Sequence, residues 1–309
     1  MDQDGAGETA GSPQPGPPAA GTLKRIGQRL EWLGFWLVAA LFGALPLDKA
    51  SALSGWIWRT VAPRLRRHGR ADRNLAASLP ELSEAERETI LLSMWESLGR
   101  TFAEAFHLGD IASDPSRIAI VLPQDVQDAV AGGRGCVLAS LHLGNWEIAT
   151  MAAMRVGFRP AGVYQRIKNP HVDADVTRLR APYYPAGLFT KGHNTALKLT
   201  RHLRAGGTLA VMSDLRDVRG VSVPFFGRPA PSTPFPVLLA RSQAVPLVAG
   251  RVVRLDGARF RVDTELVPVP RTGDRDTDIA TGTAALHAVF ERWIRDTPGQ
   301  WMWAHRRWG

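Results

Sequence analysis

Cysteine is almost missing from this chain, because Cys136 is the only one among 309 residues. A single thiol excludes an intrachain disulfide, which fits a reducing compartment for the main domain. Because Cys136 lies within an apolar run, we expect a buried core thiol and not a nucleophile. Spacings typical of zinc ligands and a Walker phosphate-binding loop are missing as well, so the sequence indicates neither a metal site nor a cofactor.

Acidic side chains are in deficit. The chain has 38 Lys and Arg residues against 29 Asp and Glu residues, which gives a formal net charge of +9. Such a charge favours anionic partners, among them lipid head groups, an acidic protein and nucleic acid. Because no RNA-binding aromatic signature is present, we expect no nucleic-acid partner.

Large apolar side chains are scarce in residues 1–22, which are rich in Gly, Pro, Ala and Ser. Such a segment cannot bury enough surface to offset the entropy of ordering, so it is predicted to be a disordered tail.

A long hydrophobic run is missing too. The uncharged stretch from Trp32 to Leu47 has about 16 residues, or roughly 24 Å as a helix, slightly short of a membrane span. The apolar stretch becomes longer if Leu30 and the aliphatic part of the Glu31 side chain are counted with it.

Segment 23–62 is nevertheless predicted to be a membrane anchor followed by an interfacial helix. Trp32 and Trp36 suit the interface belt of a bilayer. Residues 50–62 carry bulky apolar side chains, and a basic cluster at 64–70 follows them. This combination is typical of a helix that lies against anionic lipid. A soluble hydrophobic helix and a cleaved signal peptide are the alternatives, and a span and an interfacial position both stay open.

Residues 63–309 are predicted to form one large domain in which strands alternate with helices. Ser83 and Glu86 form a capping-box pattern at the start of its first long helix. The expected strands cover 136–141 and 208–213, an Asp-Gly hairpin joins 245–255 to 258–267, and the expected helices cover 84–107, 146–154, 194–204 and 276–295. This order predicts an α/β fold with a mixed central sheet flanked by helices.

The most informative motif is His142-Leu143-Gly144-Asn145-Trp146-Glu147, which directly follows an apolar strand. A strand-to-helix turn presents side chains to a cleft and leaves backbone N–H groups without partners. A neutral imidazole at His142 can take a proton from an alcohol near pH 7, and a carboxylate on its other nitrogen fixes the tautomer. Glu147 is the predicted carboxylate. Taken alone, the H-x-x-x-x-E spacing is more often a surface histidine near a surface glutamate.

Five ordered blocks, the motif among them, resemble the bacterial lipid A biosynthesis acyltransferases, the late lauroyl and myristoyl transferases. The resemblance covers about residues 24–309. The blocks are Arg73-Asn74-Leu75 with 80–99, His142 to Glu147, Val163-Tyr164 through Asn169-Pro170, Ser213-Asp214 with Val223 to Ala230, and Pro298 to Trp308.

The resemblance implies transfer of a fatty acyl chain from an acyl carrier protein thioester to a hydroxyl of a lipid A precursor. It also implies a glycerolipid-acyltransferase-like fold at the bacterial inner membrane, with inner-membrane lipids as neighbours and the catalytic domain on the cytoplasmic face. Two positions depart from the family pattern. Gln165 stands where Arg is common, with Arg166 beside it, and Leu215 replaces the usual Gln.

Acyl transfer from a thioester to an alcohol needs a base, donors for the tetrahedral oxyanion, and contacts that hold both substrates. We expect His142 to be the base, oriented by Glu147, and the backbone N–H groups of 144–146 to be the oxyanion donors. No covalent enzyme intermediate is then required. Ser140 lies two residues before His142 but lacks the Gly-x-Ser-x-Gly elbow of a serine hydrolase.

The remaining candidates are expected to bind substrate. Asn145 either shapes the turn or contacts substrate, and Asp214 follows a strand end, where a site and a cap are both common. Arg166 and Arg180 are candidates for contacts with phosphates of the acceptor or carrier. Three more lie in one rigid loop that either lines an acyl tunnel or packs in the core: Phe225, Phe226 and Gly227.

Other function classes stay open beside the leading one. The chain could acylate a lysophospholipid or another glycolipid. It could also be a non-catalytic membrane lipid-binding protein, although the intact His142 and Glu147 argue against that. A serine hydrolase using Ser140 would release free fatty acid without an acceptor.

Overall fold

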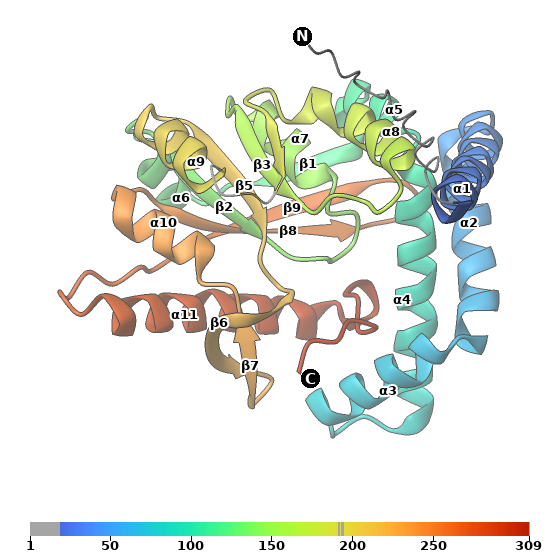
Figure 1. The fold of residues 1–309 in the computed structure, drawn as a ribbon. Helices are drawn as coiled ribbons and strands as arrows, with labels where there is room; N and C mark the ends of the chain where they lie inside the picture. The colour runs from blue at the N-terminus through green and yellow to red at the C-terminus, as the bar shows by residue number, and fades with distance from the viewer. Residues whose placement is uncertain (1–18, 191, 193–194, 309) are drawn as a thin grey trace, which may run out of the picture.

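The computed structural model describes residues 19–190, 192 and 195–308, and a seven-stranded sheet forms its centre (Figure 1). The strand order β1-β9-β8-β2-β5-β3-β4 puts β2 in the middle. The β8–β9 pair is antiparallel and the other neighbouring pairs are parallel, so the sheet is mixed, as predicted. The strands of this sheet are β1 (Ile118–Val121), β2 (Cys136–Ser140), β3 (Pro160–Tyr164), β4 (Leu188–Thr190), β5 (Thr208–Met212), β8 (Leu247–Arg254) and β9 (Phe260–Val267).

Helices flank the sheet and also stand beyond one of its ends (Figure 1). A separate antiparallel ribbon of β6 (Arg216–Phe225) and β7 (Arg228–Ser232) packs beside the last helix. The helices are α1 (Ala19–Gly43), α2 (Leu47–Val61), α3 (Arg66–Ser78), α4 (Glu84–Glu104), α5 (Leu108–Ser113), α6 (Gln124–Val130), α7 (Ile148–Arg155), α8 (Pro170–Arg180), α9 (Thr195–Arg204), α10 (Phe235–Gln243) and α11 (Arg275–Asp296).

Several elements form close to where the sequence predicts them. The apolar runs give β2 and β5, and the Asp-Gly signal gives the β8–β9 hairpin with Gly257 at φ +61°. The capping box is present at α4: the Glu86 backbone N–H donates to the Ser83 hydroxyl, and the Ser83 N–H donates to the Glu86 carboxylate. Local signals sufficed here because each element depends on residues near in sequence.

The N-terminal region differs from its prediction. Of the predicted disordered tail 1–22, residues 1–18 lie outside the described residues, and α1 already begins at Ala19. Within the described part of the chain, no helix combines the length and the apolar character needed to cross a membrane. The expected N-terminal membrane helix is therefore not supported. Charged residues from Lys24 to Glu31 interrupt the apolar character of the first half of α1.

Helices α2 and α4 pack side by side at one end of the fold (Figure 1). Their close approach depends on Gly99, since a Cβ at that position would lie 2.6 Å from the Ser54 carbonyl oxygen. The Ser54 hydroxyl donates to the Gly99 carbonyl at 2.7 Å, and the Ser51 hydroxyl donates to Glu104 at 2.6 Å. One face of α2 is therefore buried and hydrogen-bonded, whereas Trp56 on its other face is exposed.

The main hydrophobic core joins the sheet to α10, α11 and the C-terminal segment 298–308. Trp301 and Trp303 are fully buried within it. Trp301 forms an isolated antiparallel bridge with Leu143, which lies just after β2. The end of the chain is thereby held beside the turn that carries the predicted site.

Candidate active site

Two neighbouring parallel strands place His142 beside Asp214. In the register of β2 and β5, Ser140 is opposite Met212, and the Ser213 N–H extends the ladder to the Ser140 carbonyl at 2.8 Å. His142 and Asp214 each follow this last pair by two residues. The Nδ1 atom of His142 lies 2.7 Å from Oδ1 of Asp214, and the His142 backbone N–H donates to Oδ2 at 2.9 Å.

Asp214 is fully buried and also accepts a hydrogen bond from Nε1 of Trp301 at 2.9 Å. Burial alone would raise the pKa of its carboxyl, but the charge and hydrogen bonds of His142 hold that pKa below its ordinary value. The Asp214 carboxylate therefore accepts the Nδ1–H of His142. When the ring is neutral, a proton held on Nδ1 leaves Nε2 unprotonated, as a general base requires.

His142 borders a long cleft that we call the His142 cleft. Its side chain is 14% exposed, and the Trp146 ring packs edge-on against it with a centroid distance of 4.9 Å. Much of the cleft wall is apolar and can bury hydrocarbon. The apolar wall comes mainly from α8 and from α4 with the residues just after it, and α1 adds one side chain: Leu98, Phe102, Phe106, Val172, Val176 and Phe35 of α1.

Glu147 also lines the His142 cleft, but its carboxylate binds a different partner. It accepts hydrogen bonds from Nε of Arg180 at 2.9 Å, from Nη2 of the same guanidinium, and from Nε1 of Trp146 at 3.1 Å. The prediction that Glu147 orients His142 is therefore corrected, because the carboxylate on the imidazole is that of Asp214. Glu147 is the N-cap residue of α7, where it reaches the last turn of α8.

Arg180 stays positively charged in this position. Burial alone would lower the pKa of its guanidinium, yet the adjacent Glu147 carboxylate raises that pKa overall. The pair ties α8, which forms part of the cleft wall, to the turn that carries His142. A buried pair of this kind fixes position more than it adds stability.

The turn itself depends on Gly144, which has φ +58°. A Cβ there would clash with the Val252 carbonyl, so glycine is required. The Gly144 N–H donates to the Gln300 carbonyl at 3.0 Å, and the Thr101 hydroxyl donates to the Gly144 carbonyl at 3.0 Å. The predicted use of the Gly144 N–H as an oxyanion donor is corrected, since that N–H already has a partner.

Asn145 lies behind the turn and is fully buried. Its Nδ2 donates to Glu104 at 2.9 Å, and its Oδ1 accepts from the Glu147 N–H at 3.2 Å. Glu104 is itself paired with Arg254 in the core. Of the two predicted roles, the geometry shows the shaping of the turn, and Asn145 does not border the cleft.

Comparisons with known proteins identify the family of this chain. A family model described as "Bacterial lipid A biosynthesis acyltransferase" matches residues 22–309. The chain belongs to this family of acyltransferases. It is 28% identical over 298 residues to the lipid A biosynthesis lauroyltransferase of Escherichia coli (strain K12), with 90% of each chain covered. It is also 26% identical over 275 residues to the phosphatidylinositol mannoside acyltransferase of Mycobacterium tuberculosis (strain H37Rv), covering 81% of this chain and 80% of the relative.

In this acyltransferase the other predicted substrate residues lie away from the His142 cleft. Arg166 is exposed, with its Nε atom 3.9 Å from Asp173. The expectation of an acyl tunnel lined by the 225–227 loop is corrected. Phe225 and Phe226 pack against the C-terminal tryptophans in the core, and Gly227 makes the turn between β6 and β7 with φ +67°.

Neither candidate nucleophile of the acyltransferase is arranged for attack. The Ser140 hydroxyl donates to the Gly250 carbonyl at 2.8 Å within the sheet, and Ser140 is 7% exposed. Its position fits a strand residue better than a serine nucleophile. Cys136 is buried, and burial raises the pKa of its thiol to about 11, so the thiol stays protonated. The prediction of a core thiol is confirmed.

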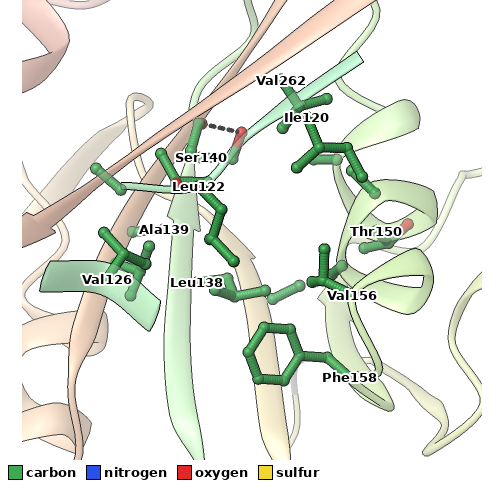
Figure 2. Close-up of a pocket in the computed structure, with 18 of the residues that line it drawn as sticks. Ile120, Leu122, Val126, Leu138, Ala139, Ser140, Thr150, Val156, Phe158 and Val262 are labelled. Atoms are coloured by element: carbon green, nitrogen blue, oxygen red, sulfur yellow. Dashed lines mark hydrogen bonds between the residues drawn. The ribbon is translucent and has the colours of Figure 1, made fainter. Parts of the chain in front are cut away.

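A second cavity of the acyltransferase is almost entirely apolar (Figure 2). Figure 2 shows Leu138, Val156 and Phe158 around it, with Ser140 and Thr150 at its edge. The cavity lies between the sheet and helices α6 and α7. His142 is not among its lining residues, so it is separate from the His142 cleft.

His305, from the C-terminal block Pro298 to Trp308, has its ring beside that of His142, with a centroid distance of 5.4 Å. Its Nε2 atom is buried and has no hydrogen-bond partner among the described residues. Burial lowers the pKa of His305 to about 4, so the ring is neutral near pH 7. Its place in the His-Arg-Arg-Trp end of the chain was the available signal.

Proposed function

We propose that this protein transfers a fatty acyl chain from an acyl carrier protein thioester to a hydroxyl of a lipid A precursor. One observation carries the proposal. His142 presents Nε2 to a largely apolar cleft while buried Asp214 binds its Nδ1. That is the arrangement of a general base next to a site that can hold a fatty acyl chain.

In the proposed reaction, Nε2 of His142 accepts the proton of the acceptor hydroxyl as the oxygen attacks the thioester carbonyl carbon. The tetrahedral intermediate then collapses, the carbon–sulfur bond breaks, and the imidazolium returns its proton to the leaving thiolate. Asp214 stabilises the imidazolium between these two steps. The N–H group of Trp146, which borders the cleft beside the N-terminus of α7, is the proposed oxyanion donor.

The apolar face of α1 supports action at a membrane surface. Its exposed side chains recur at helical spacing along one stripe: Leu23, Ile26, Leu30, Leu33, Leu37 and Leu41. A stripe of this length is larger than the scattered apolar residues of an ordinary surface. We place it in the lipid interface, with the catalytic part on the cytoplasmic face of the bacterial inner membrane.

The wall of the His142 cleft includes part of the same helix, which connects the membrane to the site. Phe35 of α1 lines the cleft, and Nε1 of Trp32 donates to Asp175 of α8 at 2.7 Å. The Asn169 amide donates to the Gln28 carbonyl at 2.7 Å. A lipid that rests against α1 therefore lies close to the cleft, where its hydroxyl can reach His142.

A second acceptor class has a specific observation in its favour. The mycobacterial relative is named for acylating a phosphatidylinositol mannoside, and the sequence identity is close to that with the lauroyltransferase. Another glycolipid is therefore the alternative acceptor. A non-catalytic lipid-binding protein is disfavoured, because His142 and Asp214 retain the geometry of a base and its partner.

The test is transfer by the full chain in detergent, with an acyl carrier protein thioester or a coenzyme A thioester as donor. Each donor is offered a lipid A precursor, a phosphatidylinositol mannoside or a lysophospholipid, and the acylated lipid is measured. We expect transfer to the lipid A precursor, faster from the carrier protein because its acidic surface suits this basic chain.

Two variants make the test specific. Substitution His142→Ala should lower transfer by about 10²–10⁴-fold, the usual effect of losing a general base. Substitution Ser140→Ala should leave transfer largely intact, because its hydroxyl serves the sheet. Transfer only to another glycolipid would establish the alternative acceptor, and retention of more than about a third of the activity by His142→Ala would falsify the general-base role.

A further inference from the structure

One end of the His142 cleft carries three arginines that differ from the apolar wall in character. Arg67 and Arg70 come from α3, and Arg306 comes from the C-terminal segment. Arg67 and Arg306 are exposed and Arg70 is half-buried. His142 therefore shares its cleft with side chains suited to hydrocarbon and with side chains suited to an anion.

These three guanidinium groups have no carboxylate partner among the described residues. The acids nearest them in sequence are engaged elsewhere. Asp72, the acid nearest Arg67 and Arg70, binds Arg87 at 3.0 Å, and Asp296, the acid nearest Arg306, binds Arg251 at 3.0 Å. Charged groups arranged along a cleft without counter-charges attract an anionic ligand.

The acidic side chain of the cleft does not neutralise this end. Among the described lining residues that side chain is Glu147, and Arg180 already binds it. His305, which lies next to His142, is neutral because burial, with the positive charge of Arg67 contributing, lowers its pKa to about 4. The end of the cleft beside His142 is thus net cationic.

The arginines are held in a fixed relation although they are far apart in sequence. Asn74 shares the α3 face of Arg67 and Arg70, at spacings of seven and four residues. Its side-chain amide donates to the carbonyls of Trp303 and His305, both at 2.8 Å. These two hydrogen bonds from one amide hold α3 against the segment that carries Arg306.

We propose that Arg67, Arg70 and Arg306 form a binding site for a phosphate group of a substrate, placed so that the reacting group of that substrate reaches His142. A guanidinium binds phosphate through parallel N–H bonds, and three such groups suit a dianionic phosphate monoester. The proposal rests on the acyl transfer proposed above and names what its cleft recognises.

The main experiment compares a phosphorylated sugar-lipid acceptor with the same acceptor after enzymatic removal of its phosphate. The variants are the double substitution Arg67→Gln with Arg70→Gln, and the single substitution Arg306→Gln. We expect KM for the phosphorylated acceptor to rise on the order of 10–100-fold, with a much smaller change in kcat, because a charge-assisted bond is lost. The phosphate-free acceptor should show no such change.

A matched control removes one positive charge far from the cleft. Arg201 is exposed on α9, which lies at the other end of the fold from α3 (Figure 1). Substitution Arg201→Gln should leave KM for both acceptors unchanged. Equal losses with the phosphorylated and phosphate-free acceptors in the cleft variants would overturn the proposal, since the arginines would then act without regard to phosphate.

A phosphate is also present in the phosphopantetheine arm of an acyl carrier protein, so a second arm varies the donor. Acyl-phosphopantetheine and acyl-pantetheine are compared in the same variants. If KM rises in the variants only when the acceptor carries a phosphate, the site binds the acceptor. If KM rises only when the donor carries a phosphate, the site binds the carrier arm. Either outcome supports a phosphate site.

Equilibrium binding separates this proposal from the proposed reaction. Calorimetry with glucosamine 1-phosphate as probe measures the site without turnover, and the double variant should bind at least about tenfold more weakly than the wild type. If the wild type binds the probe but transfers no acyl group, the reaction fails and the site stands. If the double variant loses only affinity for anionic vesicles and binds the probe as well as the wild type, the arginines serve the membrane surface and the proposal fails.

Discussion

The Nδ1 atom of His142 lies 2.7 Å from Oδ1 of Asp214, although the two residues are 72 positions apart in the chain. We expect Asp214→Asn to lower kcat by about 10³–10⁴-fold with little change in KM. An amide in place of the anion neither stabilises the imidazolium nor fixes the tautomer that leaves Nε2 free. Steady-state kinetics of wild type and variant, with circular dichroism to confirm folding, would measure this.

The matched comparison is Asp173→Asn. Asp173 is another carboxylate near the cleft, on α8, where its Oδ1 accepts from the backbone N–H of Ile167 at 2.8 Å. This variant should retain most of kcat, because Asp173 does not contact His142. A folded Asp214→Asn enzyme with kcat within threefold of the wild type would remove Asp214 from the mechanism.

The surroundings of His142 show which features of the site could be predicted from the sequence and which could not. The strand, the turn and the place of His142 on that turn could be predicted because they depend on residues 136–147 alone. The spacing within that window also suggested Glu147 as the partner, since it was the nearest carboxylate. The real partner depends on β2 lying beside β5 in a given register, which is a non-local fact. Asp214 was predicted to bind substrate because it follows a strand, and the structure instead pairs it with His142.

The aromatic loop at 225–227 illustrates the same limit. Two adjacent phenylalanines suit a tunnel wall and a core equally well, because both environments are apolar. The choice is made by Trp301, Trp303 and Trp308, which return from the end of the chain and enclose the loop. A helix was predicted in the N-terminal region from its apolar residues, but α1 ends at Gly43 and not at Leu47, and no helix of the described residues is long and apolar enough to cross a membrane.

The Glu147–Arg180 pair gives a prediction about coupling. The Glu147 side chain is 9% exposed and that of Arg180 is 29% exposed, so removing one partner leaves a poorly solvated charge. We expect Glu147→Gln and Arg180→Gln each to lower both stability and transfer. Breaking a buried pair typically costs about 3–5 kcal/mol, and exposure of Arg180 brings this site toward or below the lower value.

A double-mutant cycle measures this coupling. The variant with both substitutions should be less destabilised than the sum of the two single variants, because neither charge is then left alone. Denaturant unfolding of the four proteins gives the free energies, and kcat is measured in parallel. Strict additivity would show that the two side chains act independently of each other.

The exposed stripe of α1 gives a prediction about membranes. Leu30, Leu37 and Leu41 are each more than half exposed in the structure. Replacing all three by Ser should lower partition into vesicles by on the order of 1000-fold or more, because each leucine contributes at least about 1.5 kcal/mol when it is buried in lipid. Vesicle flotation measures the partition. Leu197→Ser on α9, which also removes an exposed leucine, is the control and should partition like the wild type. Equal partition of the triple variant would mean that α1 does not hold the protein on lipid.

Buried His287 in α11 gives a prediction about pH and stability. Its Nδ1–H donates to the Thr283 carbonyl at 2.9 Å, and its Nε2 is buried with no partner among the described residues. Burial, with the nearby positive charge of Arg307, lowers the pKa of His287 to about 4. The unfolded chain takes up a proton on this residue near the ordinary histidine pKa, whereas the folded protein does so only in stronger acid.

The sign of the effect follows from that difference. As pH falls from about 6.5 toward 4, the unfolded state gains a proton that the folded state does not bind, so the free energy of unfolding decreases. The full contribution of His287 to the free energy of unfolding is about 3 kcal/mol.

Substitution His287→Asn keeps a donor for the Thr283 carbonyl but does not titrate. The free energy of unfolding of this variant should therefore fall less steeply with decreasing pH. The difference in slope corresponds to at most one proton, even if the variant is less stable near pH 7. Urea unfolding in detergent at about pH 7, 5.5 and 4.5 measures the slopes, with His171→Asn as the control because His171 is exposed in the folded state. Identical slopes for His287→Asn and the wild type would show that His287 binds its proton equally in both states.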